Sequence, residues 1–85
     1  MTDPYAPREP GMSPSLVIRL LQLLDQGATM PQLRAVSGMA RVQTARYLRY
    51  LREGFGCEID YDRGANRYRL TGWGVFDAEQ VRRWL

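Results

Sequence analysis

The 85-residue sequence contains no histidine and no lysine, and its single cysteine is Cys57. One cysteine cannot form an internal disulfide, and without histidine the usual ligands of a zinc site are missing. A Ser–His or Cys–His catalytic pair is excluded for the same reason. The carboxylates do not cluster as an acid/base pair. The sequence therefore favours a protein that is not an enzyme and that needs no cofactor.

Long apolar runs are also missing. No run approaches the ~18 residues that a membrane-spanning helix needs, and the start of the chain lacks the basic and apolar segments of a secretory signal. We therefore expect a cytoplasmic protein without a membrane partner, and no small-molecule site is evident. The hydrophobic fraction of 45% is ordinary for a globular chain, and the length fits one small domain of modest stability.

Positive charge is present but unevenly distributed. All twelve cations are arginines, yet the formal net charge is only +3. Five arginines lie between Arg34 and Arg52, a stretch without an acidic residue, whereas six of the nine acids follow position 52. A local basic stripe is the electrostatic footprint of a polyanionic partner.

The first part of the chain predicts a tail and one helix. Residues 1–12 hold three prolines and show no periodicity, which is typical of a flexible terminus. Ser13 and Pro14 then predict the start of a helix that continues to about Gln26. Its leucines recur at helical spacing, so this helix should belong to the core. Gly27 should end it.

A helix-turn-helix pattern follows. A capping box formed by Thr29 and Gln32 predicts the start of a second, short helix. Gly38 can adopt the left-handed conformation of a tight turn, and a third helix is predicted from about Arg41 to Glu53. Two helices joined by such a turn form the pattern.

The third predicted helix has two unlike faces. Helical spacing places an apolar set on one face, which should pack on the first two helices. This apolar set is Thr44, Tyr47, Leu48 and Leu51. The opposite face and the exposed start of the helix hold Arg41, Val42, Gln43, Ala45, Arg46 and Arg49. We expect this second group to contact DNA, because arginine can bind guanine with two hydrogen bonds, glutamine can read adenine, and apolar side chains can touch a thymine methyl group.

A β-hairpin is predicted next, since apolar residues alternate with polar ones on both sides of a turn sequence from Arg63 to Asn66. The inward residues of the first strand would be Cys57, Ile59 and Tyr61. This register gives four cross-strand pairs: Tyr61 with Tyr68, Ile59 with Leu70, Asp60 with Arg69 and Asp62 with Arg67. The two acid–arginine pairs should occupy both arginines within the hairpin. The turn should stay free, so Arg63 and Asn66 are candidates for contact with the DNA backbone.

Two stretches of the sequence resemble the N-terminal DNA-binding domains of DeoR-like and WYL-type bacterial regulators. They are LRAVSGMARVQTARYLRYLRE and FGCEIDYDRGANRYRL. The resemblance covers about Ser15 to Trp73. It implies an α+β winged helix-turn-helix fold: a three-helix core and a two-stranded β-hairpin wing, followed here by a short C-terminal helix. It also implies that the third helix enters the major groove while the wing lies on the adjacent backbone or minor groove. Two residues depart from the family's pattern: Arg34 replaces a small residue, and Ala40 replaces the usual Ser or Thr.

These observations predict a winged helix-turn-helix domain over residues 13–76. The expected function is sequence-specific binding of double-stranded DNA by a small bacterial or phage transcriptional regulator. Thr29, Gln32 and Arg34 are included in the expected contact surface, although capping alone can explain the first two. The alternative function is a protein-interaction module whose basic face binds an acidic partner.

The last element is a predicted C-terminal helix over residues 77–85, capped by Asp77. Its apolar stripe consists of Ala78, Val81, Trp84 and Leu85. One winged module buries only ~600–1,000 Å² on DNA, so a homodimer would double the interface. Val81, Trp84 and Leu85 are the expected dimer contacts. The alternative is that the stripe covers the first helix of its own chain.

Overall fold

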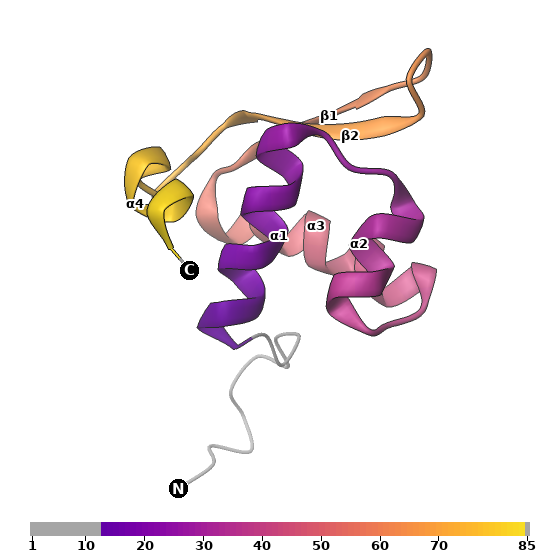
Figure 1. Cartoon of the computed structure of the whole chain (residues 1–85), viewed down its shortest axis with the longest axis horizontal. Helices are drawn as coiled ribbons and strands as arrows, with labels where there is room; N and C mark the ends of the chain where they lie inside the picture. Colours follow the sequence, from indigo (N-terminus) through magenta and orange to yellow (C-terminus); the bar gives the residue numbers. More distant parts are fainter. Residues whose placement is uncertain (1–12, 85) are drawn as a thin grey trace, which may run out of the picture.

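The computed structural model of the chain describes residues 13–84 and shows a small α+β domain with four helices and one antiparallel hairpin (Figure 1). The elements are α1 (Pro14–Gln26), α2 (Met30–Ser37), α3 (Arg41–Phe55), β1 (Glu58–Asp62), β2 (Arg67–Gly72) and α4 (Ala78–Arg83). None of the described helices is long and apolar enough to cross a membrane. The tail predicted over residues 1–12 and the terminal Leu85 lie outside the described residues.

The starts of α1 and α2 follow the predicted capping chemistry. The Ser13 hydroxyl accepts a hydrogen bond from the Leu16 amide, and Pro14 occupies the first turn of α1. Thr29 and Gln32 form a reciprocal capping box at the start of α2. Gly38 has a φ of 69°, which lets the chain turn from α2 into α3.

The hydrophobic core lies where α1, α2, α3 and the hairpin meet. On α3 the buried residues are Thr44, Tyr47, Leu48 and Leu51, which confirms the predicted apolar face. The facing residues are Val17, Leu20, Leu21 and Leu24 of α1, Leu33 of α2, and Cys57, Ile59 and Leu70 of the hairpin segment. One face of α3 is therefore committed to packing.

The predicted end of α3 was wrong by two residues. The helix continues past Glu53 to Phe55 and ends at Gly56, which has a φ of 72°. The Phe55 ring lies 5.3 Å from that of Tyr50 and 5.0 Å from that of Phe76, measured between centroids. These aromatic contacts support a last turn that Gly54 alone would weaken.

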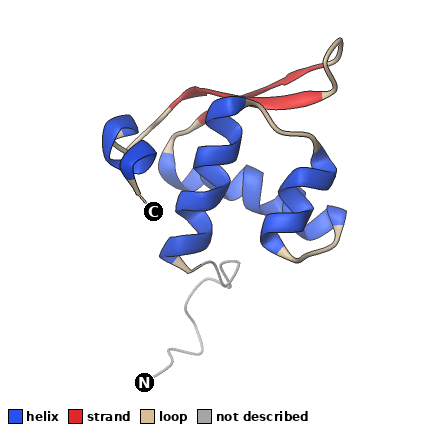
Figure 2. Ribbon diagram, viewed as in Figure 1, coloured by secondary structure: helices blue, strands red, loops and turns tan. Residues whose placement is uncertain are grey.

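The predicted hairpin register is confirmed at all four cross-strand pairs, and the predicted burial of Tyr61 is wrong. Tyr61 is 44% exposed, because it lies on the part of the hairpin that extends past the helices. Its ring packs against that of Tyr68 at a centroid distance of 4.8 Å, with the two planes tilted by 52°. Figure 2 shows the hairpin lying across one end of α1, with its turn projecting away from the helical core.

The predicted acid partners of the two strand arginines are also corrected. Arg67 donates a hydrogen bond to the Gly27 carbonyl oxygen at 3.1 Å, and Asp62 accepts bonds from the turn amides of Gly64 and Ala65. The Arg69 guanidinium lies over Gly27, at the end of α1. Both arginines therefore serve the contact between α1 and the hairpin.

A third backbone segment flanks β2. The Ala28 amide donates to the Tyr68 carbonyl at 2.9 Å, and the Tyr68 amide donates to the Ala28 carbonyl at 2.7 Å. This pairing joins the loop between α1 and α2 to the edge of β2 that β1 leaves open. It fixes the root of the hairpin relative to the first two helices.

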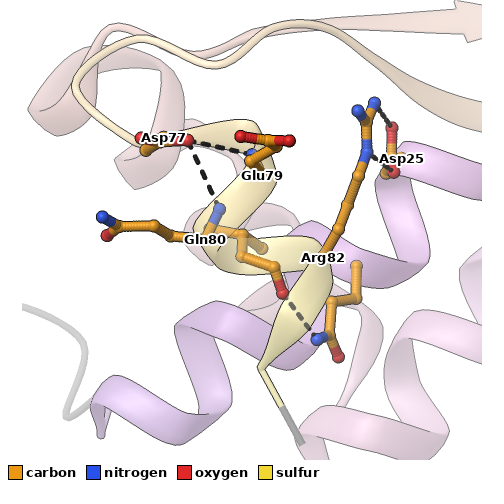
Figure 3. Close-up of polar contacts among 7 residues, drawn as sticks. Asp25, Asp77, Glu79, Gln80 and Arg82 are labelled. Atoms are coloured by element: carbon orange, nitrogen blue, oxygen red, sulfur yellow. Dashed lines mark hydrogen bonds and ion pairs between the residues drawn. The ribbon is translucent and has the colours of Figure 1, made fainter.

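The C-terminal helix α4 packs on α1 of its own chain, which was the alternative to a dimer contact (Figure 3). Val81 is buried, and Gln22 of α1 donates to the carbonyl oxygens of Val81 and Trp84 at 2.8 and 2.7 Å. Arg82 donates two hydrogen bonds to Asp25, at 2.8 and 3.0 Å. This contact lowers the pKa of the Asp25 carboxyl.

Candidate nucleic-acid interface

The exposed side of α3 holds all six residues that the sequence singled out on this helix. We call this set the α3 surface: Arg41, Val42, Gln43, Ala45, Arg46 and Arg49, all exposed. Val42 is 71% exposed although it is apolar. Because the opposite face of the helix is buried in the core, the α3 surface is held by a rigid element.

The arginines of α3 differ in their partners. Among the described residues, none forms a hydrogen bond or an ion pair with Arg41 or Arg46. Arg52 donates to the Ile59 carbonyl oxygen at 2.9 Å and so links α3 to β1. Arg49 donates through Nε to Glu53 at 3.1 Å, so one arginine of this face has an acidic partner. The partner lies just beyond the acid-free stretch, one helical turn from Arg49.

The start of α3 has no side-chain cap. Ala40 stands at the cap position and supplies no hydrogen-bonding side chain. The first intrahelical bond is that of the Thr44 amide to the Ala40 carbonyl oxygen. The amides before Thr44 therefore remain available in the described structure, next to the positive end of the helix dipole and the Arg41 side chain.

The start of α2 is more fully occupied. The Gln32 amide is bound by the Thr29 hydroxyl, and the Thr29 amide by the Gln32 side chain. Pro31 has no amide hydrogen. Arg34 is exposed, and its Nε donates to the Met39 carbonyl oxygen at 3.3 Å, which braces the turn between α2 and α3. The structure thus gives Thr29, Gln32 and Arg34 roles in holding α2, and their contact with DNA stays a prediction.

The two residues proposed at the hairpin turn are not equivalent. Asn66 has a φ of 55°, and its side-chain oxygen accepts a hydrogen bond from the Tyr61 hydroxyl. Arg63 is exposed and has no hydrogen bond or ion pair to the rest of the described chain. The turn was expected to be free, and this holds for Arg63 but not for the Asn66 oxygen.

The three predicted dimer contacts are separated by the structure. Val81 is buried against its own chain and Trp84 is 54% exposed, while Leu85 lies outside the described residues. Val81 is therefore occupied within the monomer, and the homodimer stays a prediction. Within residues 13–84, no group of side chains is arranged to hold a metal ion.

Comparison with known proteins does not identify a relative. No protein-family model matches the chain, and no curated protein or solved structure is significantly similar to it.

Proposed function

We propose that the protein binds double-stranded DNA sequence-specifically, with α3 in the major groove. The observation that best supports this proposal is the α3 surface: one side of a helix that is anchored in the core exposes Arg41, Arg46 and Arg49. The major groove of B-DNA admits an α-helix, and its base edges present distinct patterns of hydrogen-bond donors and acceptors. A bacterial or phage transcriptional regulator that acts by occupying its site is the role that fits best.

The arrangement of elements supports a winged helix-turn-helix reading. Two helices, α2 and α3, are joined by the short turn at Gly38, and the hairpin is anchored beside them through Ala28 and Tyr68. In this proposal the hairpin is the wing. Its projecting turn carries Arg63 to the phosphate backbone beside the groove that α3 occupies.

The side chains divide into two kinds of contact. We expect Arg46 and Gln43 to read base edges, and Val42 and Ala45 to touch thymine methyl groups. We expect Arg41 and Arg63 to bind phosphates, which sets the position of the protein but carries no sequence information. Binding is the whole mechanism, and no chemical step follows it.

A fluorescence-anisotropy titration of a labelled duplex of random sequence tests this proposal. We expect binding at low salt whose affinity falls steeply as salt rises, because cations on the protein release counterions from DNA. Selection of bound sites from a random duplex pool should then yield a preferred sequence. Failure to bind duplex DNA at low salt would overturn the proposal and leave the acidic-protein partner as the better explanation of the basic face.

A further inference from the structure

Glu53 is the only acidic residue of α3, and it lies on the exposed side of the helix. Counting back by four, seven and eleven residues reaches Arg49, Arg46 and Val42, so these side chains form one row along the helix. A carboxylate in this row would face the same groove as the arginines. This placement needs an explanation, since phosphates repel a carboxylate.

The contact between Glu53 and Arg49 has a definite geometry. The Arg49 Nε atom donates to the Glu53 Oε1 atom at 3.1 Å, and the two side chains are 74% and 67% exposed. In the described structure the two terminal nitrogens of Arg49 have no hydrogen-bond partner. These two nitrogens are the pair that can bind O6 and N7 of guanine.

Stability does not account for Glu53. An exposed ion pair of this kind contributes little to folding. The residue also lies in the last turn of α3, where the helix dipole disfavours a negative charge. A residue whose charge opposes the helix dipole without a stabilising gain is expected at a functional position.

We propose that Glu53 is a specificity-determining residue of the α3 surface, holding Arg49 toward a guanine and away from phosphates. This inference rests on the proposed function. When Arg49 is bound through Nε, its freedom to reach the DNA backbone is reduced, so it contributes less to non-specific binding. On the matching sequence the Arg49–guanine contact offsets the repulsion, and the second Glu53 oxygen can accept from the amino group of a neighbouring cytosine.

The substitution Glu53→Gln removes the charge and keeps the size of the side chain. We expect the affinity for random duplex to rise, and the plot of log affinity against log salt to steepen by about 0.9, because Arg49 gains one phosphate contact. The ratio of affinities for the selected site and for random duplex should fall by roughly ten-fold, which is within the discrimination of one bidentate contact. Thermal unfolding should be nearly unchanged.

Glu79→Gln is the matched control. Glu79 pairs with Arg83 on α4 at 3.4 Å, with the same spacing of four residues and similar exposure. This control alters the net charge equally and lies off the α3 surface, so the affinity ratio should stay at the parent value. A second comparison uses Arg49→Ala, in which adding Glu53→Gln should no longer lower the ratio.

The outcomes separate this inference from the proposed function. If the parent protein binds duplex DNA and selects a site, but Glu53→Gln changes both affinities as Glu79→Gln does, only the role of Glu53 is overturned. A loss of discrimination that persists in the Arg49→Ala background would also overturn it. Absence of a preferred site, or of duplex binding by the parent protein, would overturn the inference together with the specificity on which it rests.

Discussion

At the scale of single residues, the two sides of α3 should respond differently to substitution. Leu48 and Leu51 are buried, whereas Val42 and Arg46 are exposed on the same helix. A truncation on the buried side removes packing and leaves a cavity. A truncation on the exposed side removes a group that is available to a partner, so it should change binding and leave stability nearly unchanged.

Arg46→Ala should weaken binding to the selected DNA site by about 1–3 kcal/mol, because a bidentate base contact would be lost. The melting transition should be intact, since Arg46 has no partner among the described residues. Arg83→Ala on α4 removes the same charge away from the α3 surface and serves as the control. An unchanged affinity in a folded Arg46→Ala variant would remove Arg46 from the interface.

Leu48→Ala should lower the free energy of unfolding by about 2–5 kcal/mol, as expected for a buried leucine. Leu48 is 2% exposed, and Val42, on the opposite side of α3, is 71% exposed. Val42→Ala should therefore change stability by less than about 0.5 kcal/mol. Urea unfolding of both variants checks the assignment. Similar losses in the two variants would mean that the two sides of α3 are not distinct.

At the scale of elements, the sequence predicted the features that are determined by residues close together in the chain. The capping box of α2, the apolar face of α3 and the hairpin register are set by local spacing and are confirmed. The last two residues of α3 were missed because a contact of Phe55 with the distant Phe76 ring supports them. The pairing of Ala28 with Tyr68 was missed for a similar reason, since a single paired residue leaves no periodic signal.

Two glycines with positive φ offer a test of the contact between the segment after β2 and α3. Gly38 and Gly74 have φ values of 69° and 59°. A Cβ atom at Gly38 would meet nothing within 4 Å, whereas one at Gly74 would lie 2.0 Å from the Phe55 carbonyl oxygen. Gly38→Ala should cost about 1–2 kcal/mol from the left-handed conformation alone.

Gly74→Ala should cost distinctly more than Gly38→Ala, because the same conformational penalty is joined by a clash with the backbone at the end of α3. Chemical denaturation of the two variants under identical conditions gives the comparison. Equal losses would show that the Gly74 segment does not pack against α3 as described.

At the scale of the whole molecule, α4 closes one side of the domain through α1. Besides Val81 and the bonds to Asp25, the Arg82 guanidinium lies 5.3 Å from the centre of the Trp73 ring. The sequence left open whether this apolar stripe would pack on a second copy or on its own chain. An apolar stripe has the same helical spacing in both cases. Light scattering would test the dimer, with a monomer mass of 9.8 kDa as the contrary result.

The packing of α4 on α1 should weaken at acid pH. The Arg82 guanidinium lowers the pKa of the Asp25 carboxyl from its ordinary value of 3.8. A carboxyl with a lowered pKa in the folded state stabilises the protein above the unfolded value, and this stabilisation is lost as the pH falls through the folded value. Asp25→Asn should therefore be less stable than the parent protein at neutral pH, and the difference should shrink as the pH falls below the ordinary carboxyl pKa of 3.8.

Urea unfolding of the Asp25→Asn variant at neutral and acid pH measures this difference. Asp60→Asn is a suitable control, because Asp60 is an exposed acid of β1 without an ion pair in the described chain. A stability difference for Asp25→Asn that stays constant with pH would contradict the role given to the Asp25–Arg82 contact.

The candidate site was predictable in part. Exposure of the α3 surface followed from helical spacing, because the apolar positions fix which side of α3 faces the core. The hydrogen-bond partners of two other arginines, Arg34 and Arg67, could not be predicted from spacing. Arg34 binds the Met39 carbonyl oxygen and Arg67 binds that of Gly27, and such bonds depend on where backbone oxygens come to lie in the folded chain. Contact with DNA itself stays a prediction.

An NMR titration of isotopically labelled protein with duplex DNA tests whether α3 and the hairpin turn form the DNA interface, since it reports which backbone amides sense the partner. We expect that at low salt the largest shifts fall on Arg41–Arg49 of α3 and on the hairpin turn near Arg63, and that α4 is little affected. Shifts concentrated on α1 and α4 with α3 unchanged, or no shifts on addition of duplex, would contradict this interface.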